Sequence, residues 1–241
     1  MISIVIPALN EEKYLPDCIN SLKHQNWNGE YEIIVVDNGS TDRTSQIARD
    51  LGVKVISCPR RGVVYARQAG TEEAKGEIVV QVDADTIYHT NWLGQIDKHF
   101  TIHPDSAGLA GRYIYIHPAW WAPLERVYRT VLNGVGQLVF HWPPSVSGAN
   151  FAFRRSAFLQ ASGYDPASLQ PDQWGIARRL SKYGKIYYEK KLVVTTSSRR
   201  VVKPVYVLIY ESLRNCYRVS IHFCRHCNRW VSKTIFKQGE P

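Results

Sequence analysis

The sequence predicts an α/β protein with a mostly parallel central sheet that is flanked by helices on both faces. Short apolar runs alternate four times with helical patterns within the first 82 residues. The connections between these segments are short, and polar clusters follow three of the apolar runs. Such alternation is typical of parallel strands joined by crossover helices.

The first half of the chain supplies most of this pattern. Short apolar runs that end in proline, glycine or polar residues predict buried strands over residues 2–6, 33–36, 53–56 and 78–82. Apolar residues at helical spacing predict helices that contain residues 15–22, 47–51 and 63–75. Gly52 and Gly76 mark the ends of the last two helices.

The second half alternates less regularly. We expect strands over residues 107–116, 146–153, 185–188 and 192–196, and helices over residues 120–140, 154–161 and 172–183. From residue 204 onward the chain is basic and aromatic, which indicates one or two amphipathic helices. Since there is no internal repeat or low-complexity linker, the sequence predicts one domain over residues 1–200 and a basic helical extension over residues 201–241.

The composition restricts the class of protein and of partner. The 241 residues, 44% of them hydrophobic, suffice for one large core without disulfides. The formal net charge of +9 favours an anionic partner: nucleotide phosphates, an acidic membrane face or nucleic acid. The chain opens on an apolar strand without the features of a signal peptide, and five scattered cysteines favour a reducing compartment. We therefore expect a cytoplasmic protein.

Several motifs of other functional classes are missing from the sequence. There is no G-x-x-x-x-G-K-[ST] loop, no G-x-G-x-x-G after the first strand and no G-x-S-x-G elbow. A P-loop NTPase, a kinase and an ordinary dehydrogenase are therefore disfavoured. Cys224 and Cys227, with His222 and His226 nearby, offer one CxxC pair, for which a basic helix is the preferred interpretation over a zinc site.

Polar residues cluster after three of the predicted strands, over residues 7–12, 37–42 and 83–86. Parallel sheets bind ligands beyond the carboxyl ends of their strands, so we expect the three clusters to meet in one crevice. Asp83 and Asp85 would point to the same side by strand alternation and provide oxygen ligands for Mg²⁺ or Mn²⁺. The alternative is a solvated turn with helix-capping aspartates.

Other polar residues of these clusters leave two interpretations open. Asp37 either hydrogen-bonds a base or sugar edge or starts its turn, and Glu11 either reaches a ligand or caps its helix. Arg60 and Arg61 precede a helix and suit an anion, whereas Arg199, with its neighbour Arg200, suits either a diphosphate or an acidic membrane.

Four segments together resemble the family 2 glycosyltransferases of the GT-A fold. They are Ile4-Val5-Ile6-Pro7-Ala8-Leu9-Asn10-Glu11-Glu12, Val35-Val36-Asp37-Asn38-Gly39-Ser40-Thr41-Asp42, Val82-Asp83-Ala84-Asp85 and Ser147-Gly148-Ala149-Asn150-Phe151-Ala152-Phe153-Arg154. The resemblance extends from residue 2 to about residue 200. It implies that residues 1–106 form a nucleotide-sugar-binding half and residues 107–200 an acceptor-side half.

The resemblance also implies an inverting transferase that uses a nucleotide-diphosphate sugar and Mn²⁺ or Mg²⁺. Matching positions assign the nucleoside to Pro7, Ala8, Asn10, Glu11 and Asp37, nucleotide support to Arg67, ribose or metal contact to Asp83, and metal coordination to Asp85. A sugar or lipid-linked acceptor is expected, with peripheral contact of the basic extension to the inner face of the membrane as a further expectation. No nucleic-acid partner is expected.

The catalytic base is the point at which this sequence departs from the family. An acidic pair usually opens the helix concerned, and here the pair reads Asp172-Gln173. The second acid is often the base, but glutamine cannot accept a proton, so Asp172 is the preferred base and a helix N-cap its alternative role. A catalytically degenerate nucleotide-sugar-binding protein, a nucleotidyltransferase and a nucleotide- or nucleic-acid-binding module are the rival functions.

Overall fold

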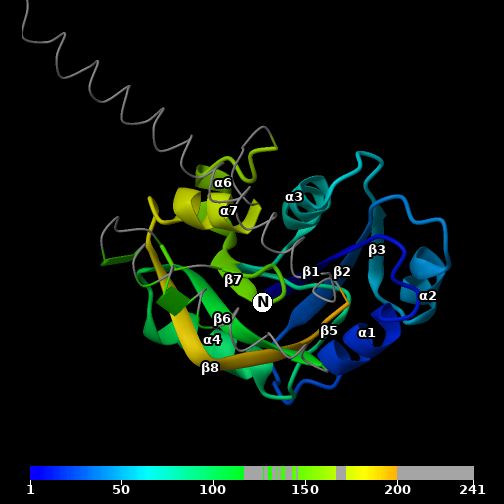
Figure 1. The fold of residues 1–241 in the computed structure, drawn as a ribbon, viewed down its shortest axis with the longest axis horizontal. Helices are drawn as coiled ribbons and strands as arrows, with labels where there is room; N and C mark the ends of the chain where they lie inside the picture. Colours follow the sequence, from blue (N-terminus) through cyan, green and yellow to red (C-terminus); the bar gives the residue numbers. More distant parts are fainter. Residues whose placement is uncertain are drawn as a thin grey trace, which may run out of the picture.

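The computed structural model describes residues 1–116, 146–166 and 172–199, with only single positions between residues 127 and 144, and only the backbone of Asp172. These residues form an eight-stranded sheet with the order β3-β2-β1-β4-β7-β6-β8-β5. Helices cover both faces of the sheet (Figure 1). The predicted α/β class with a central sheet flanked by helices is therefore confirmed.

The N-terminal half is a parallel sheet, as predicted. It consists of β1 (Ile2–Ala8), β2 (Tyr31–Asp37), β3 (Lys54–Ser57) and β4 (Ile78–Gln81), and β1 lies between β2 and β4. The first strand continues through Pro7, where the sequence predicted its end. The pairing of β1 with β4 stops at Val5 and Gln81, so the missing amide hydrogen of Pro7 lies beyond that ladder.

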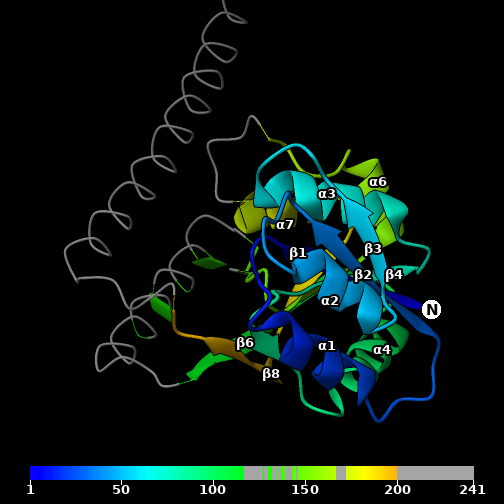
Figure 2. The same ribbon diagram turned by 90° about the vertical axis from the view of Figure 1, so that its right-hand side faces the viewer.

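Two helical layers enclose the sheet (Figures 1 and 2). One layer contains α1 (Leu15–Lys23), α2 (Thr44–Asp50) and α4 (Trp92–Ile102), and the other contains α3 (Val63–Glu73), α6 (Arg155–Gln160) and α7 (Asp172–Leu180). The strands are apolar on both sides, which supplies one buried cluster for each layer. In β1, for example, Ile4 and Ile6 face the first layer and Val5 faces the second.

The second half makes the sheet mixed rather than parallel throughout. It adds β5 (Thr86–Ile87), β6 (Ser106–Ile116), β7 (Phe151–Arg154) and β8 (Lys185–Ser197). The strand β7 runs antiparallel to both β4 and β6, and β8 runs parallel to β6 but antiparallel to β5. The alternation rule that predicted a parallel sheet thus applies to the first four strands only.

Two strands in this half differ from the prediction by more than one residue. The two short strands expected over residues 185–188 and 192–196 form the single strand β8, which passes an irregularity in its pairing with β6 after Gly111. The strand expected over residues 146–153 begins only at Phe151, because the preceding segment turns at Asn150. The side chain of Asn150 accepts a hydrogen bond from Trp92 Nε1 at 3.0 Å and donates to the carbonyl oxygens of Arg112 and Leu192, which fixes this turn against α4, β6 and β8.

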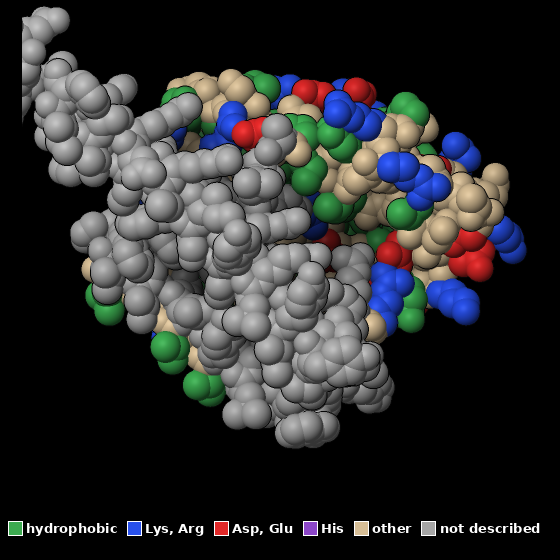
Figure 3. Space-filling model, turned by 45° about the horizontal axis from the view of Figure 1, so that its top comes forward, with side chains coloured by type: hydrophobic (Ala, Val, Ile, Leu, Met, Phe, Trp, Pro, Cys, Tyr) green, Lys and Arg blue, Asp and Glu red, His purple; other side chains and the backbone are tan. Residues whose placement is uncertain are grey.

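Several expectations lie outside the described residues. They are most of the aromatic segment over residues 120–140, the basic extension over residues 201–241 and the Cys224/Cys227 pair. In the part of the chain that is described, no helix combines the length and apolar character needed to cross a bilayer. On the face shown in Figure 3, the Lys and Arg side chains of the described residues intermingle with Asp and Glu rather than forming a patch of one sign.

Candidate functional site

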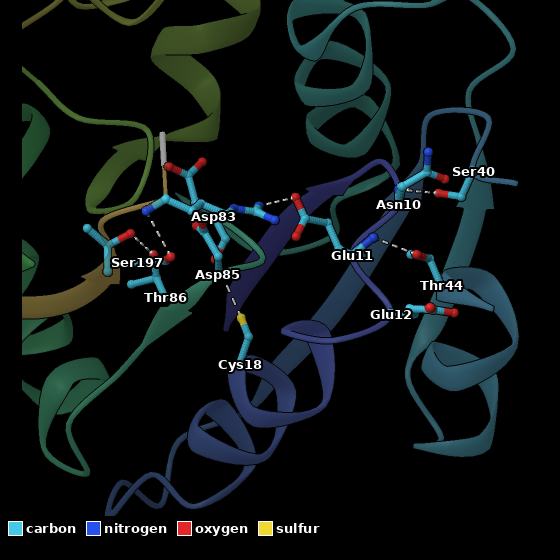
Figure 4. A network of polar contacts seen from close by, with 12 residues as sticks. Asn10, Glu11, Glu12, Cys18, Ser40, Thr44, Asp83, Asp85, Thr86 and Ser197 are labelled. Carbon is cyan, nitrogen blue, oxygen red and sulfur yellow. Dashed lines mark hydrogen bonds and ion pairs between the residues drawn. The ribbon is translucent and has the colours of Figure 1, made fainter. Parts of the chain in front are cut away.

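Three loops meet at the carboxyl-end edge of the parallel strands. Ala8 pairs with Asp37 across β1 and β2, and the turn that contains Asp83 and Asp85 follows β4, the other neighbour of β1. Figure 4 shows Glu11 lying between this turn and the segment that carries Ser40 and Thr44. The predicted convergence of the polar clusters is therefore present.

The loop after β1 is fixed to the loop after β2 by hydrogen bonds in both directions. The backbone N–H of Asn10 donates to Ser40 Oγ at 3.0 Å, and Asn10 Oδ1 accepts from the N–H of Thr41 at 2.8 Å. Asn10 adopts a φ of 56°, a left-handed conformation that asparagine tolerates better than most residues. The N–H of Glu11 donates to the buried hydroxyl of Thr44 at 2.8 Å. These bonds hold the two loops as one unit.

Asp37 is held in its ionised form by its own turn. Its carboxylate accepts hydrogen bonds from the N–H of Ser40 at 3.0 Å and the hydroxyl of Ser45 at 2.7 Å. Partial burial alone would raise the pKa of Asp37, but these hydrogen bonds outweigh that effect and lower it. Asp37 therefore starts its turn, as one of the two interpretations predicted, and presents a charged oxygen acceptor at the edge of the sheet.

Asp83 is paired with a buried arginine. Arg67 Nη2 lies 2.9 Å from Asp83 Oδ1, and only 6% of the Arg67 side chain is exposed. A Cβ atom on Gly148 would lie 1.9 Å from Arg67 Nη2, so the absence of a side chain at Gly148 is what lets the guanidinium occupy this position. With its amide oxygen turned towards Arg67, Gln173 accepts hydrogen bonds from Nε at 3.3 Å and from Nη1. Arg67 is therefore enclosed by residues from both halves of the chain.

The nearly buried carboxylates of Asp85 and Glu11 share another arginine. Arg199 Nε donates to Asp85 Oδ2 at 2.9 Å, and Arg199 Nη2 is paired with Glu11 Oε1. The guanidinium also lies over the ring of Tyr14, 4.5 Å from its centroid. Burial alone would lower the pKa of Arg199, but the hydrogen bond to Glu11 and the charge of Asp85 raise it. Arg199 is consequently a permanent cation at this point of the site.

The residues around Asp83 and Asp85 fit a hard divalent cation only in part. Carboxylate oxygens suit Mg²⁺ and Mn²⁺, which often take one or two protein carboxylates and complete their coordination with substrate phosphates. Strand alternation does not orient the two aspartates as predicted, because β4 ends at Gln81 and both lie in the following turn. Among the described residues, no group of three or more acidic, histidine or cysteine side chains could enclose a metal. The described residues can thus supply carboxylate ligands but not a complete cage.

The turn that carries the two aspartates rests on two buried residues, Cys18 of α1 and Tyr88, which directly follows β5. The thiol of Cys18 approaches the carbonyl oxygen of Asp83 at 3.6 Å, as Figure 4 shows from the side of α1. The hydroxyl of Tyr88 accepts from the N–H of Asp83 at 3.3 Å and donates to the carbonyl of Ala149 at 2.9 Å. Burial raises the pKa of both Cys18 and Tyr88. Both therefore act as neutral supports of the turn.

Comparison with known proteins shows the family of this chain. The model of glycosyl transferase family 2 matches residues 3–160. The chain belongs to this family. Its described fold is that of the GT-A glycosyltransferases, and its likeness to a mannosyltransferase from Pyrobaculum calidifontis, solved with GDP-Man and Mn²⁺, has a TM-score of 0.68 at 20% identity, over 80% of this chain and 56% of the other.

Curated relatives of this family 2 chain include glycosyltransferases of Haloferax volcanii and Methanococcus voltae. Glycosyltransferase AglE of Haloferax volcanii is 34% identical over 38% of this chain and 33% of its own length. A dolichyl N-acetyl-α-D-glucosaminyl phosphate 3-β-D-2,3-diacetamido-2,3-dideoxy-β-D-glucuronosyltransferase of Methanococcus voltae is 31% identical over 55% of this chain and 46% of its own length. The matches thus span between about a third and a half of these relatives.

The family positions predicted from the sequence differ in what they offer a ligand. Ala8, the last residue of β1, is buried in the core, and Pro7 before it is partly exposed. Asn10, in contrast, is exposed, and Glu11 is nearly buried. Asp172 begins α7, but its side chain lies outside the described residues.

The site also contains residues that motif matching did not assign to it. Gly148 and Gln173 belong to segments that resemble the family, but their contacts with Arg67 are not evident from spacing. The sequence left two partners open for Arg199, a diphosphate or an acidic membrane, and did not predict the contacts with Asp85 and Glu11 that the structure shows. Arg199 reaches Asp85 because β8 pairs with β5 at Thr86, and the N–H of Ser197 donates to the carbonyl of Asp85 at 3.0 Å. Only this long-range pairing identifies the contact.

Proposed function

We propose that this family 2 chain binds a nucleotide-diphosphate sugar and transfers the sugar, with inversion of its anomeric configuration, to a hydroxyl group of a glycan acceptor. The observation that supports this most strongly is the convergence of three strand ends, which brings Glu11, Asp37 and the turn of Asp83 and Asp85 to one edge of the sheet. Open α/β sheets bind ligands at such an edge.

The donor half contributes fixed hydrogen-bonding groups to nucleotide binding. Asp37 keeps lone pairs that can accept from a base or a ribose hydroxyl in addition to its two serine bonds. Asn10 and Glu11, with the backbone at Pro7 and Ala8, form the wall next to it. The buried Arg67 orients Asp83 for contact with ribose or metal. Because these groups are already hydrogen-bonded in place, little ordering is needed when the donor binds.

The transfer itself is a single displacement. A bond forms between the acceptor oxygen and the anomeric carbon while the bond from that carbon to the diphosphate oxygen breaks, and the nucleoside diphosphate leaves with the electron pair. Asp172, at the start of α7, accepts the proton of the acceptor hydroxyl, since the neutral amide of Gln173 cannot. Attack opposite the leaving group inverts the anomeric configuration.

Asp85, together with Asp83, is the proposed protein contribution to a Mn²⁺ or Mg²⁺ site. When bound, the ion supplies positive charge beside the departing diphosphate. Solved GT-A structures offer support by analogy, since the Pyrobaculum mannosyltransferase and a mycobacterial glucosyl-3-phosphoglycerate synthase both contain Mn²⁺.

The names of relatives support a lipid-linked or cell-envelope glycan as acceptor. The Methanococcus voltae relative is named for a dolichyl phosphate-linked sugar, and TarS of Staphylococcus aureus for poly(ribitol-phosphate). Peripheral membrane contact through the basic extension over residues 201–241 accords with such an acceptor and is proposed from its sequence alone.

Gln173 is the observation that favours a second candidate, a catalytically degenerate protein that binds nucleotide sugars. Its position matches the acid that often serves as base, yet its neutral amide lies beside Arg67, where the amide oxygen, once turned towards the guanidinium, can accept hydrogen bonds. The two candidates share donor binding and differ only in turnover.

A panel of UDP- and GDP-sugars tests the proposal on the full chain. Thermal stabilisation by a donor in the presence of Mn²⁺ or Mg²⁺, together with metal-dependent release of the nucleoside diphosphate, is the expected result. Asp37→Asn should reduce the stabilisation, whereas Asp97→Asn, on the exposed side of α4, should leave it unchanged. Stabilisation without any release would favour the degenerate protein. Absence of stabilisation by every donor would refute nucleotide-sugar binding.

A further inference from the structure

Arg199 occupies a position that a metal-binding site would normally leave open. It contacts Asp85, the carboxylate proposed to coordinate a divalent cation, and Glu11 from the opposite loop. Both carboxylates are nearly buried, so their charges require a cation close by. The guanidinium of Arg199 supplies this cation from within the chain.

We propose that Arg199 is a tethered counter-ion between Asp85 and Glu11, and that a divalent cation binds at Asp85 only after Arg199 has left. The inference rests on the proposed metal site of the donor half and adds to it a regulation by the chain's own cation. A bound nucleoside diphosphate offers Arg199 a new anionic partner, so the guanidinium exchanges carboxylates for phosphate as the cation enters.

The contact geometry supports direct competition. A divalent ion approaches a carboxylate oxygen to about 2.1 Å. Asp85 Oδ2 already accepts from Arg199 Nε at 2.9 Å, and the same guanidinium is paired with Glu11. A second cation within a few ångströms of the guanidinium would be repelled through a poorly solvated region. The two cations therefore exclude one another at this pair of carboxylates.

A comparison of the two site arginines explains why Arg199 rather than Arg67 is the exchangeable one. The Arg67 side chain is 6% exposed and enclosed by Gly148 and Gln173, whereas the Arg199 side chain is 29% exposed. Arg199 also lies two residues beyond the end of β8. Among the described residues, Tyr14 is the only aromatic side chain that contacts its guanidinium. Movement of Arg199 thus breaks no strand pairing.

The decisive experiment measures binding of Mn²⁺ alone by electron paramagnetic resonance of the free ion, without donor or turnover. Arg199→Gln removes two charge-assisted contacts, so Mn²⁺ affinity should rise on the order of ten- to a hundredfold relative to the parent protein. Arg199→Lys keeps the charge and should give a much smaller gain. Lys190→Gln, an exposed charge on β8, is the matched control for net charge and should leave the affinity unchanged.

Tyr14→Leu provides a test that alters no charge. Loss of the ring beneath the guanidinium should loosen Arg199 and raise Mn²⁺ affinity roughly two- to fivefold. Thermal melts establish that each variant is folded. If Arg199→Gln binds Mn²⁺ no more tightly than the parent, or more weakly, Arg199 orients Asp85 for the metal instead of competing with it, and the proposal is wrong.

Added nucleotide tests the exchange itself. UDP or GDP should raise Mn²⁺ affinity more in the parent protein than in Arg199→Gln, because only the parent has a guanidinium to transfer to phosphate. An equal effect in both proteins would overturn the exchange. Failure of the proposed function would appear separately, as a parent protein that binds no nucleotide while the Mn²⁺ difference between the variants persists.

Discussion

The two halves of the chain contribute to the candidate site in different ways. In the donor half, the loops after β1 and β2 are held by hydrogen bonds to one another, through the N–H groups of Asn10, Glu11 and Thr41. We call these two hydrogen-bonded loops the donor frame. The acceptor-side half instead places single residues against the residues of the site, namely Gly148, Gln173 and Arg199.

This difference indicates that the two halves are suited to different tasks. A frame that is hydrogen-bonded within itself can bind the nucleotide in the same way across many acceptors. Apart from Gly148, which packs closely against Arg67, the single residues from the other half are not part of that frame, so they are suited to set the charge at the carboxylates and the chemistry of the acceptor. We therefore expect substitutions in the acceptor-side half to alter turnover and electrostatics more than nucleotide binding.

Asp172→Asn is expected to give the largest difference between the effect on the transfer rate and the effect on nucleotide affinity. Loss of the proposed base should lower the transfer rate about 10²- to 10⁴-fold, the range that general bases contribute. Nucleotide affinity should be unchanged, because Asp172 belongs to α7 and not to the donor frame. Transfer kinetics and calorimetric titration with UDP or GDP measure the two effects.

Asp165→Asn is the matched control, since Asp165 is a partly exposed aspartate of the same half that pairs with Arg179 at 3.7 Å. Its transfer rate should remain close to that of the parent. Full activity in Asp172→Asn would refute the assignment of the base and direct attention to other acids of the chain.

The donor frame was predictable from the sequence, because each of its loops follows a strand that a short apolar run in the sequence marks. The ends of β1, β2 and β4 are marked by apolar runs, and parallel pairing brings such ends together without further information. The predicted boundaries differ from the observed ones by a few residues, as at Pro7, where the strand continues.

The acceptor-side contacts were not predictable, because each depends on pairing between distant segments. Arg199 lies 114 residues after Asp85 and reaches it only because β8 pairs with the two-residue strand β5. The closeness of Gly148 to Arg67 depends on the turn that Asn150 fixes. The local spacing of apolar and polar residues predicts neither of these two contacts. The place of Asp83 and Asp85 was also missed, because both lie beyond the end of β4, where strand alternation no longer applies.

A smaller effect is expected where the acceptor-side half directly supports the donor frame. In Gly148→Ala the new methyl group would meet the guanidinium of Arg67 at 1.9 Å, and a buried, enclosed arginine has little room to move. We expect a loss of about 1–3 kcal/mol in the free energy of unfolding, as for other overpacked sites. Urea unfolding measures it, and weaker binding of UDP or GDP should accompany it as Arg67 shifts from Asp83.

Gly94→Ala is the control, since its methyl group would meet only Trp27, at an ordinary 3.7 Å, and alanine favours the helix α4. Its stability should equal or exceed that of the parent. Gly148→Ala with unchanged stability and nucleotide affinity would mean that the halves are independent at this contact.

The smallest expected effect concerns pH and comes from a group outside the candidate site, on α4, where this helix packs against β8. His99 on α4 lies 3.1 Å from Ser106 Oγ and packs against His103 and Tyr187, and burial followed by the charge of His103 lowers its pKa from 6.5 to about 4. The folded protein therefore keeps His99 neutral at pH values where the unfolded chain takes up a proton. The free energy of unfolding should fall as the pH falls from 6.5 to 4.

At the candidate site, Asp37 has a lowered pKa, so its contribution is present above the unfolded value of 3.8 and is lost only as the pH falls through its lower folded value. The upper part of this range, from pH 6.5 to about 5, lies above the unfolded pKa values of the carboxyl groups and thus reports mainly on the histidine. His99→Gln, which retains a polar group towards Ser106, should flatten this part of the profile, whereas Asp37→Asn should leave its slope unchanged. The same slope in His99→Gln as in the parent would assign the acid sensitivity to another group, and because His99 is only half-buried we expect the difference to be modest.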